Sequence, residues 1–299
     1  MTEIIMKKWK KEEEESQLLE GIYEEKKSIL NGFNVALMGA SGTGKTHSIG
    51  TLVDTGLEVF YLSLENGLES LIGYYTDKGM EIPENLHWHR VEPKKASFTA
   101  ALSNANKILT MDQKTLASTS DVYKKEYDQW IKIIKSLQNF HDDRTDKDYG
   151  AVDEWDTSRI LVIDGLTGLS KAAMHLVIGG KAMRSQSDWG IAQGQVDTLL
   201  TMLTEDCPCH FVLIAHIDRE MDEVLGGVKF MMSSLGKALY PKLPVMFSDI
   251  ILTVRDGTNW YWDTLNSQAD IKTRNLPMIS KGKPDFHQIV DKWKSRNQS

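Results

Sequence analysis

The chain has 299 residues, of which 41% are hydrophobic, and its formal net charge is −7 at pH 7. This length can bury one large core, with or without an inserted subdomain. The acidic balance argues against a generally basic nucleic-acid-binding surface, although a local basic groove stays possible. No apolar run approaches the roughly twenty residues that cross a bilayer. The first residues also lack the apolar stretch of a secretion signal, so we expect no membrane association.

The predicted organisation is an N-terminal arm, one core and a short tail. Residues 1–30 are charged and helix-prone, and we expect a solvated arm or helix that could also dock on a neighbouring subunit. The core is expected over residues 31–290, with a tail over 291–299. It begins with an apolar run at 33–38, which predicts a strand, and a helix-compatible stretch follows at 45–53.

The loop between these two elements reads Gly-Ala-Ser-Gly-Thr-Gly-Lys-Thr, a complete match to the pattern G-x-x-x-x-G-K-[ST]. Glycines let the backbone N–H groups point inward around phosphates, and the helix N-terminus adds a partial positive charge. We therefore predict a nucleoside triphosphate site, with Lys45 on the β- and γ-phosphates and Thr46 offering its hydroxyl to Mg²⁺. A glycine-rich turn without ligand is the alternative. The predicted nucleotide-binding residues are Gly39, Ala40, Ser41, Gly42, Thr43, Gly44, Lys45 and Thr46.

A second β-rich run, residues 57–65, ends in Glu65, and a short strand is expected at 87–91. Residues 96–156 are polar and helical in pattern, which predicts an inserted helical hairpin between core strands. Its acidic part, residues 142–156, is expected to be a mobile loop.

The core resumes with an apolar run at 159–164 that ends in Asp164. An aspartate there can hold Mg²⁺ opposite Thr46, or it can simply cap the following turn. AAA+ ATPases usually place a catalytic glutamate directly after this aspartate, but position 165 is glycine. Because the carboxyl ends of parallel strands converge on one crevice, Glu65 is the candidate for activating water. The alternative for Glu65 is an exposed acid at a strand end.

The next predicted elements are a helix at 187–204 and a buried strand at 210–216, which ends in His216. His216 points to the same crevice and can sense a γ-phosphate, or it can be an ordinary core histidine. A glycine-bearing, lightly basic loop is expected at 218–237. Upstream, Cys207, Cys209 and His210 could supply part of a zinc site, but without a second ligand pair we expect a loop that enters the strand. Two such cysteines suggest a reducing compartment, the cytoplasm or, for a viral protein, the host cytoplasm.

Later strands are expected at 248–254, 260–262 and 271–273, the last two antiparallel. Continuous apolar runs interleaved with helices indicate a mostly parallel sheet covered on both faces. The predicted fold class is therefore α/β.

The motifs in this order resemble the RecA-like recombinase core, and more narrowly the phage RecA-like ATPases described as single-strand annealing proteins. The likeness covers roughly residues 30–290. Three short sequence segments carry it: Ile163-Asp164-Gly165-Leu166-Thr167, Ile214-Ala215-His216 and Lys272-Thr273-Arg274-Asn275-Leu276-Pro277. It implies a RecA-like P-loop NTPase core with a helical insertion, Mg²⁺ and ATP as cofactors, and self-association into a ring or filament.

The resemblance also implies roles for individual residues. Glu65 matches the glutamate that activates water, and His216 takes the place of a sensor. The loop 218–237 takes the place of a DNA-contacting loop. Lys272 and Arg274 match basic residues that reach a neighbouring subunit's ATP, although an edge strand decorated with charges is the alternative.

The resulting hypothesis is an ATPase that binds single-stranded DNA in phage-type recombination or annealing. Few basic or aromatic residues support the DNA contact directly; Lys181, Arg184 and Trp189 form another candidate segment. The alternatives are a helicase or helicase loader, and a protein that uses ATP only as a switch for assembling partners. A small-molecule kinase is disfavoured because no short arginine-rich lid follows the phosphate-binding loop.

Overall fold

The computed structural model describes residues 30–92, 97–112, 127–179, 184–221 and 226–297. The chain divides into two compact units, residues 1–30 and 31–299. The predicted arm lies outside the described residues, except for Leu30. All elements below belong to the second unit.

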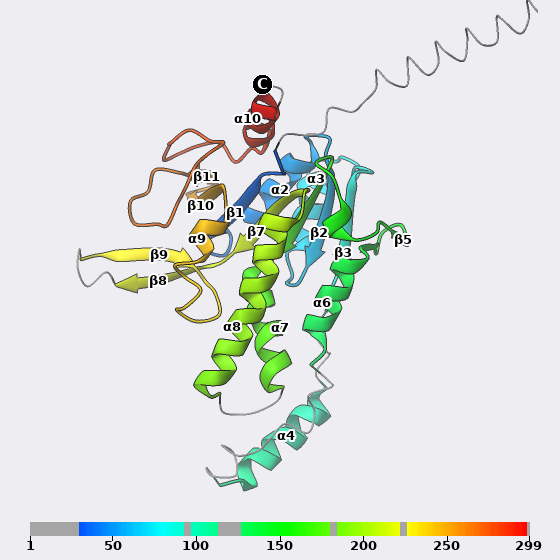
Figure 1. Cartoon of the computed structure of the whole chain (residues 1–299), viewed down its shortest axis with the longest axis vertical. Helices are drawn as coiled ribbons and strands as arrows, with labels where there is room; N and C mark the ends of the chain where they lie inside the picture. Colours follow the sequence, from blue (N-terminus) through cyan, green and yellow to red (C-terminus); the bar gives the residue numbers. More distant parts are fainter. Residues whose placement is uncertain (1–29, 93–96, 113–126, 180–183, 222–225, 298–299) are drawn as a thin grey trace, which may run out of the picture. The chain divides into compact units, whose positions relative to one another are not determined.

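The second unit is organised around a seven-stranded sheet with the order β11-β10-β1-β7-β6-β2-β3 (Figure 1). All neighbouring strands are parallel except β10 and β11, which are antiparallel. The strands are β1 (Asn34–Gly39), β2 (Glu58–Ser63), β3 (Leu86–Arg90), β6 (Arg159–Asp164), β7 (His210–Ala215), β10 (Asp249–Asp256) and β11 (Asn259–Asp263). Their apolar runs are continuous because most of these strands are buried on both faces.

Helices cover both faces of this sheet. Successive residues of a strand point to opposite faces; in β1, Val35 and Leu37 belong to one apolar cluster and Ala36 and Met38 to the other. The first cluster includes residues of α2 (Lys45–Val53), α3 (Leu68–Thr76) and α10 (His287–Asn297). The second includes residues of α6 (Gln129–Gln138), α7 (Leu166–Ile178) and α8 (Gln186–Thr201). The predicted α/β P-loop architecture with a mostly parallel, doubly covered sheet is confirmed.

The remaining elements are α4 (Phe98–Thr110), α9 (Leu243–Met246), a 3-10 turn η2 (Val152–Glu154), a π-helical turn η3 (Met202–Asp206) and the two-stranded pairs β4 (His141–Asp142) with β5 (Lys147–Asp148) and β8 (Ile217–Met221) with β9 (Val228–Met232). Within the described ranges, no helix combines the length and the apolar character that crossing a bilayer requires.

The mobile loop expected at 142–156 is wrong, because this segment takes part in the β4–β5 pair, forms η2 and is anchored by a few buried residues. Asp142 is fully buried; its carboxylate accepts hydrogen bonds from the Thr145 hydroxyl (2.6 Å) and the Trp88 backbone N–H (3.2 Å), and it lies 3.1 Å from Nδ1 of His87. Trp155 is buried as well. Acidic composition suggested solvation, but carboxylates with hydrogen-bond partners can be buried beside aromatic rings.

Two predictions about the later part of the chain also need correction. The segment 218–237 is not simply a loop, because β8 and β9 pair as an antiparallel hairpin within it (Figure 1). The strand expected at 271–273 is reduced to one antiparallel bridge between Lys272 and Ile250.

A buried carboxylate holds the segment after that bridge. Asp249, at the start of β10, is fully buried. Its Oδ1 accepts hydrogen bonds from the backbone N–H groups of Arg274 (2.7 Å) and Asn275 (2.8 Å). Its Oδ2 accepts from the Asn275 side-chain amide at 2.6 Å and from the Ser248 hydroxyl at 3.0 Å.

We expect Asp249→Ala to lower the free energy of unfolding by about 3 kcal/mol, because it leaves buried N–H groups without an acceptor. Urea denaturation measures this change. Asp256→Ala on the same strand is the control: its exposed carboxylate pairs with the exposed Lys281, and such surface ion pairs contribute little, so stability should stay the same. Equal effects of the two substitutions would contradict the anchoring role of Asp249.

Candidate functional site

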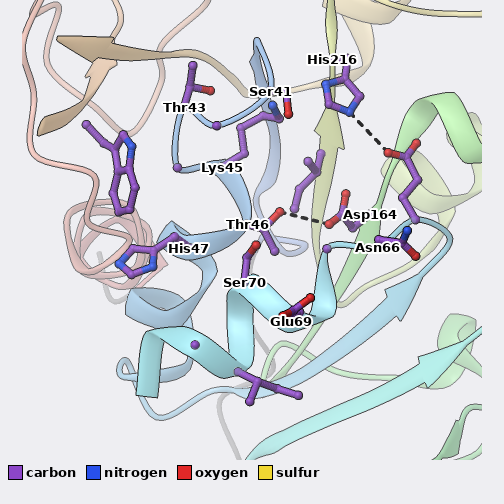
Figure 2. A pocket seen from close by; sticks show the side chains of 18 of the residues that line it. Ser41, Thr43, Lys45, Thr46, His47, Asn66, Glu69, Ser70, Asp164 and His216 are labelled. Carbon is purple, nitrogen blue, oxygen red and sulfur yellow. Dashed lines mark hydrogen bonds and ion pairs between the residues drawn. The ribbon is translucent and has the colours of Figure 1, made fainter. Parts of the chain in front are cut away.

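The strands β1, β7, β6 and β2 are neighbours and run parallel, so their carboxyl-terminal ends lie side by side at the same end of the sheet. The loop after β1, Glu65 after β2, Asp164 at the end of β6 and His216 after β7 therefore meet around one pocket of about 730 Å³. Figure 2 shows this pocket from close by. The sequence predicted that these groups converge, and Glu65, Asp164, His216 and the loop residues 41–46 line the pocket. The predicted loop residues Gly39 and Ala40 are not among the described lining residues; their carbonyl oxygens accept hydrogen bonds from Lys45 instead.

The loop after β1 depends on glycine at two positions. Gly42 and Gly44 have φ angles of 74° and 83°, a region that side-chain-bearing residues rarely adopt. At Gly44 a Cβ atom would also lie 2.8 Å from the Trp260 ring. The loop is thus shaped by backbone conformation and by contact with an aromatic residue of β11.

Lys45 is almost completely buried in this loop. Its Nζ donates hydrogen bonds to the carbonyl oxygens of Gly39 (2.8 Å) and Ala40 (2.7 Å). Burial lowers the pKa of Lys45 to about 8, against the opposing effect of the carboxylates of Asp164 and Glu65. An anion entering the loop would therefore meet a cation that is held in place and poorly solvated.

Asp164 is 4% exposed and lies opposite the start of α2. Its Oδ2 accepts hydrogen bonds from the Thr46 hydroxyl at 3.1 Å, drawn as a dashed line in Figure 2, and from the Tyr61 hydroxyl. Burial raises the pKa of Asp164, while these hydrogen bonds oppose the rise. At Gly67 a Cβ atom would lie 1.9 Å from the same carboxylate oxygen, so the space beside Asp164 requires a glycine.

Thr46 and Asp164 fit a magnesium site. They present a hydroxyl and a carboxylate oxygen side by side on the polar wall of the pocket, and Mg²⁺ prefers oxygen ligands. A divalent cation at this place would also compensate the charge of the buried carboxylate.

Glu65 is held from two sides. Its Oε1 accepts a hydrogen bond from the backbone N–H of Gly168 in α7 (2.9 Å), and its Oε2 lies 3.4 Å from Nε2 of His216 (Figure 2). Glu65 also occupies the space next to Gly165. A Cβ atom at Gly165 would lie 2.9 Å from the Ile214 carbonyl oxygen and 3.5 Å from Oε1 of Glu65. Position 165 therefore has no room for a glutamate side chain, and the carboxylate that reaches the crevice is that of Glu65, which follows the neighbouring strand β2.

Lys272 and Arg274 are not among the described residues that line this pocket. Both are exposed, and they lie level with Ile250 and Asp249. These positions pair with Ala36 and Val35, whereas Gly39 pairs with Thr253. At 3.3 Å per residue, this is about 10 Å or more along the strand before the phosphate-binding loop begins. The two cations thus have no place in the pocket of their own subunit.

Sequence reasoning missed the residues that close the other end of the pocket. Trp260 of β11 borders the pocket, is 37% exposed, and its ring centroid lies 4.6 Å from that of His47. Residues of α3, including Glu69, Ile72 and Thr76, also line the pocket, together with Asp77 directly after the helix. The sequence alone does not show that Trp260 belongs to this pocket, because its position there depends on β10 pairing with β1 and β11 pairing with β10.

The basic residues of the hairpin segment have partners within the chain. Lys229 lies 2.7 Å from Asp270, Lys237 pairs with Glu220, and the Arg219 guanidinium lies 5.6 Å from the centre of the Phe230 ring. The described residues of this segment therefore do not form a free basic patch. Of the other candidate segment, Lys181 lies outside the described residues, and the Arg184 guanidinium lies 5.4 Å from the Trp189 ring.

Cys207 and Cys209 are free and buried, and the loop they belong to enters β7, as expected. The ring of His210 accepts a hydrogen bond at Nδ1 from the Phe33 backbone N–H (2.9 Å). In the part of the chain that the structure describes, no three His, Cys, Asp or Glu side chains are grouped to hold a metal ion.

Comparison with known proteins finds one family. A family model described as an AAA domain matches residues 31–270. A search of curated proteins finds no match.

Several solved structures are similar to the chain. The RadB recombinase shares 13% identity, covering 83% of this chain and 84% of that one, with a TM-score of 0.40. The flagellar accessory protein FlaH from Methanocaldococcus jannaschii shares 10% (85% and 84%, TM-score 0.36). The ATPase EscN, in complex with its central stalk EscO from the enteropathogenic E. coli type III secretion system, shares 11% (89% and 51%, TM-score 0.38). Likenesses at this level carry no argument about activity or partners.

The lowered pKa of Lys45 predicts how nucleotide affinity depends on pH. At pH 7 most free protein carries a charged Lys45, whereas at pH 9 only about a tenth does, and bound phosphates require the charged form. Affinity for a non-hydrolysable ATP analogue should therefore fall about tenfold between pH 7 and pH 9. Lys45→Arg, which keeps its charge at both pH values, should give a flatter profile. The same slope in both proteins would contradict the prediction.

Proposed function

The chain belongs to the AAA domain family, matched over residues 31–270, and we propose that it is an Mg²⁺-dependent ATPase of RecA-like type. The observation that carries the proposal is the meeting of Lys45, Thr46, Asp164, Glu65 and His216 in one pocket. This set combines an anion-binding loop, oxygen ligands for a cation and a carboxylate oriented by a backbone N–H group.

The loop 39–46 would bind the β- and γ-phosphates through its backbone N–H groups and through Lys45, which would exchange its contacts with Gly39 and Ala40 for phosphate oxygens. Thr46 and Asp164 would hold Mg²⁺, which neutralises charge on the phosphates when it is bound. Trp260 offers an aromatic face at the far end of the pocket, suited to stacking on the nucleobase.

Hydrolysis would proceed through Glu65. Its Oε1 is fixed by the Gly168 N–H, which leaves Oε2 to accept a proton from the water that attacks the γ-phosphorus. His216 faces Oε2 and would report on this end of the pocket. The ordering of Glu65 by α7 supports this role, because a general base must be oriented before it is useful.

The proposed partner is single-stranded DNA, in recombination or annealing. The sensor position connects directly to the hairpin: the His216 carbonyl accepts a hydrogen bond from the Ser233 N–H at 2.7 Å, just beyond β9. A shift of His216 on ATP binding would thereby reach the segment 218–237 and tighten DNA affinity, and hydrolysis would relax it. We further propose self-association in the cytoplasm, with Lys272 and Arg274 serving a neighbour's ATP, since both are exposed and remote from their own pocket.

Glu65→Gln should bind ATP within a few-fold of the parent but lower kcat by about 10²- to 10⁴-fold, because the amide cannot accept the proton from water. Steady-state phosphate release and equilibrium binding of an ATP analogue provide the two measurements. Glu58→Gln is the matched control and should keep its turnover, because Glu58 lies at the opposite end of β2, pairs with Arg159 and is not among the described residues that line the pocket. Full turnover in Glu65→Gln would remove Glu65 from the mechanism.

Single-stranded DNA should stimulate ATP hydrolysis, with Lys45→Ala as the blank, and a non-hydrolysable analogue should tighten DNA binding. Both effects follow from the link between His216 and Ser233. The same DNA affinity with and without the analogue would refute the coupling. Measurable hydrolysis without stimulation or DNA retention would indicate an ATP switch for a protein partner, and sustained duplex unwinding would indicate a motor.

A further inference from the structure

A second, smaller cavity lies against α7 and shares no described lining residue with the nucleotide pocket. It has a volume of about 100 Å³ and is bordered by α7, by Arg184 before α8, and by the segment after β9. The α7 residues are Thr167, Ser170, Lys171, Met174 and His175, spaced to form one continuous helix face. Three to four waters would fill this volume at about 30 Å³ each, and drug-sized ligands need about 300 Å³ or more. The cavity therefore suits a single small polar group.

The floor of the cavity contains a buried hydroxyl that lacks a hydrogen-bond partner. Ser170 is 6% exposed, and its Oγ makes no hydrogen bond with any residue that the structure describes. The Thr167 hydroxyl, one turn earlier, is buried and unpaired as well. Unpaired buried hydroxyls are uncommon because each loses its hydration without replacement, so two on one cavity wall suit a ligand that accepts hydrogen bonds.

The rim of the cavity is positively charged. Lys171 and Arg184 border it together with His175, and among the described residues no Asp or Glu does. Burial and the charges of Arg184 and Lys171 lower the pKa of His175, in that order, which shows that both cations act on the same place. Ser233 and Ser234 add two further hydroxyls from the opposite wall.

We propose that this cavity binds a phosphate group. A phosphate brings up to two negative charges and several strong acceptor oxygens, which match two cations on the rim, a histidine and the hydroxyls of Thr167, Ser170 and Ser233. A carboxylate would leave most of these donors unused, since it offers only two oxygens. The phosphate belongs either to a free phosphorylated compound or to a phosphodiester of the single-stranded DNA proposed above. In the second case the inference rests on the proposed function, and the cavity is a place where the chain contacts that DNA.

The site is connected to both catalytic groups of the proposed ATPase. The helix that forms its floor donates the Gly168 N–H to Glu65, and Ser233 on its opposite wall donates its N–H to the His216 carbonyl. A phosphate drawn between Ser170 and Ser233 would thus pull on elements that orient Glu65 and His216. Binding itself depends only on the cavity and is separable from ATP hydrolysis.

The test uses the full chain and two charge-matched double variants. Lys171→Gln/Arg184→Gln removes the cations of the cavity, and Lys132→Gln/Lys135→Gln removes two exposed cations of α6. Inorganic phosphate is titrated by calorimetry in a Lys45→Ala background, which disables the phosphate-binding loop. An oligothymidylate is titrated separately in the otherwise unchanged chain with an ATP analogue and Mg²⁺. Ser170→Ala accompanies both titrations as a variant that leaves surface charge unchanged.

The cavity pair should weaken binding of at least one probe by about tenfold or more relative to the α6 pair, and Ser170→Ala should weaken the same probe. Loss confined to inorganic phosphate identifies a free phosphorylated ligand, and loss confined to the oligothymidylate identifies a phosphodiester. If neither probe binds, or if the cavity variants match the α6 pair with both probes, the cavity holds only water and the proposal is overturned. The phosphate titration stands even if ATP hydrolysis or DNA binding fails. If the cavity pair does not fold, Ser170→Ala alone decides the outcome.

Discussion

The buried carboxylate of Asp164 is the constraint around which the candidate site is arranged. A carboxylate that is 4% exposed is costly unless its oxygens are hydrogen-bonded or beside a cation. Tyr61 from β2 and Thr46 from α2 supply the hydrogen bonds, so three elements must take fixed positions around one oxygen atom. Gly67 completes the arrangement, because any side chain there would displace the carboxylate. The same geometry leaves an oxygen-lined place beside Thr46 that suits a magnesium ion.

The second consequence of this packing is the division of roles between neighbouring strands. Position 165 cannot carry a side chain because the Ile214 carbonyl oxygen stands in its way, and the carboxylate of Glu65 approaches from β2 instead. The N–H of Gly168 holds that carboxylate, which makes the first turn of α7 part of the candidate site. Other residues of the same helix, between Thr167 and His175, line the smaller cavity. Helix α7 therefore connects the two polar pockets.

Much of the fold could be predicted from the sequence, because buried parallel strands appear in it as continuous apolar runs. The strands ending at Gly39, Ser63, Asp164 and Ala215 were expected within a few residues, and so was the helix after the phosphate-binding loop. Where charge dominated the composition, prediction failed. The segment 142–156 is packed because Asp142 finds partners from β3, which are far away in sequence. The hairpin β8–β9 was missed because its glycines and charges are also typical of a loop.

By itself, the sequence determined which residues could bind phosphates and which strand ends carry acids, because the phosphate-binding loop is a local structure of eight adjacent residues and strand ends follow from local apolar runs. Only the tertiary structure decided which of these groups meet. The order β1-β7-β6-β2 brings Lys45, Asp164, Glu65 and His216 together, and the pairing of β10 beside β1 delivers Trp260 to the pocket while leaving Lys272 and Arg274 outside it. Strand order depends on long-range backbone pairing and on burial of both sheet faces, and neither is contained in any local stretch of residues.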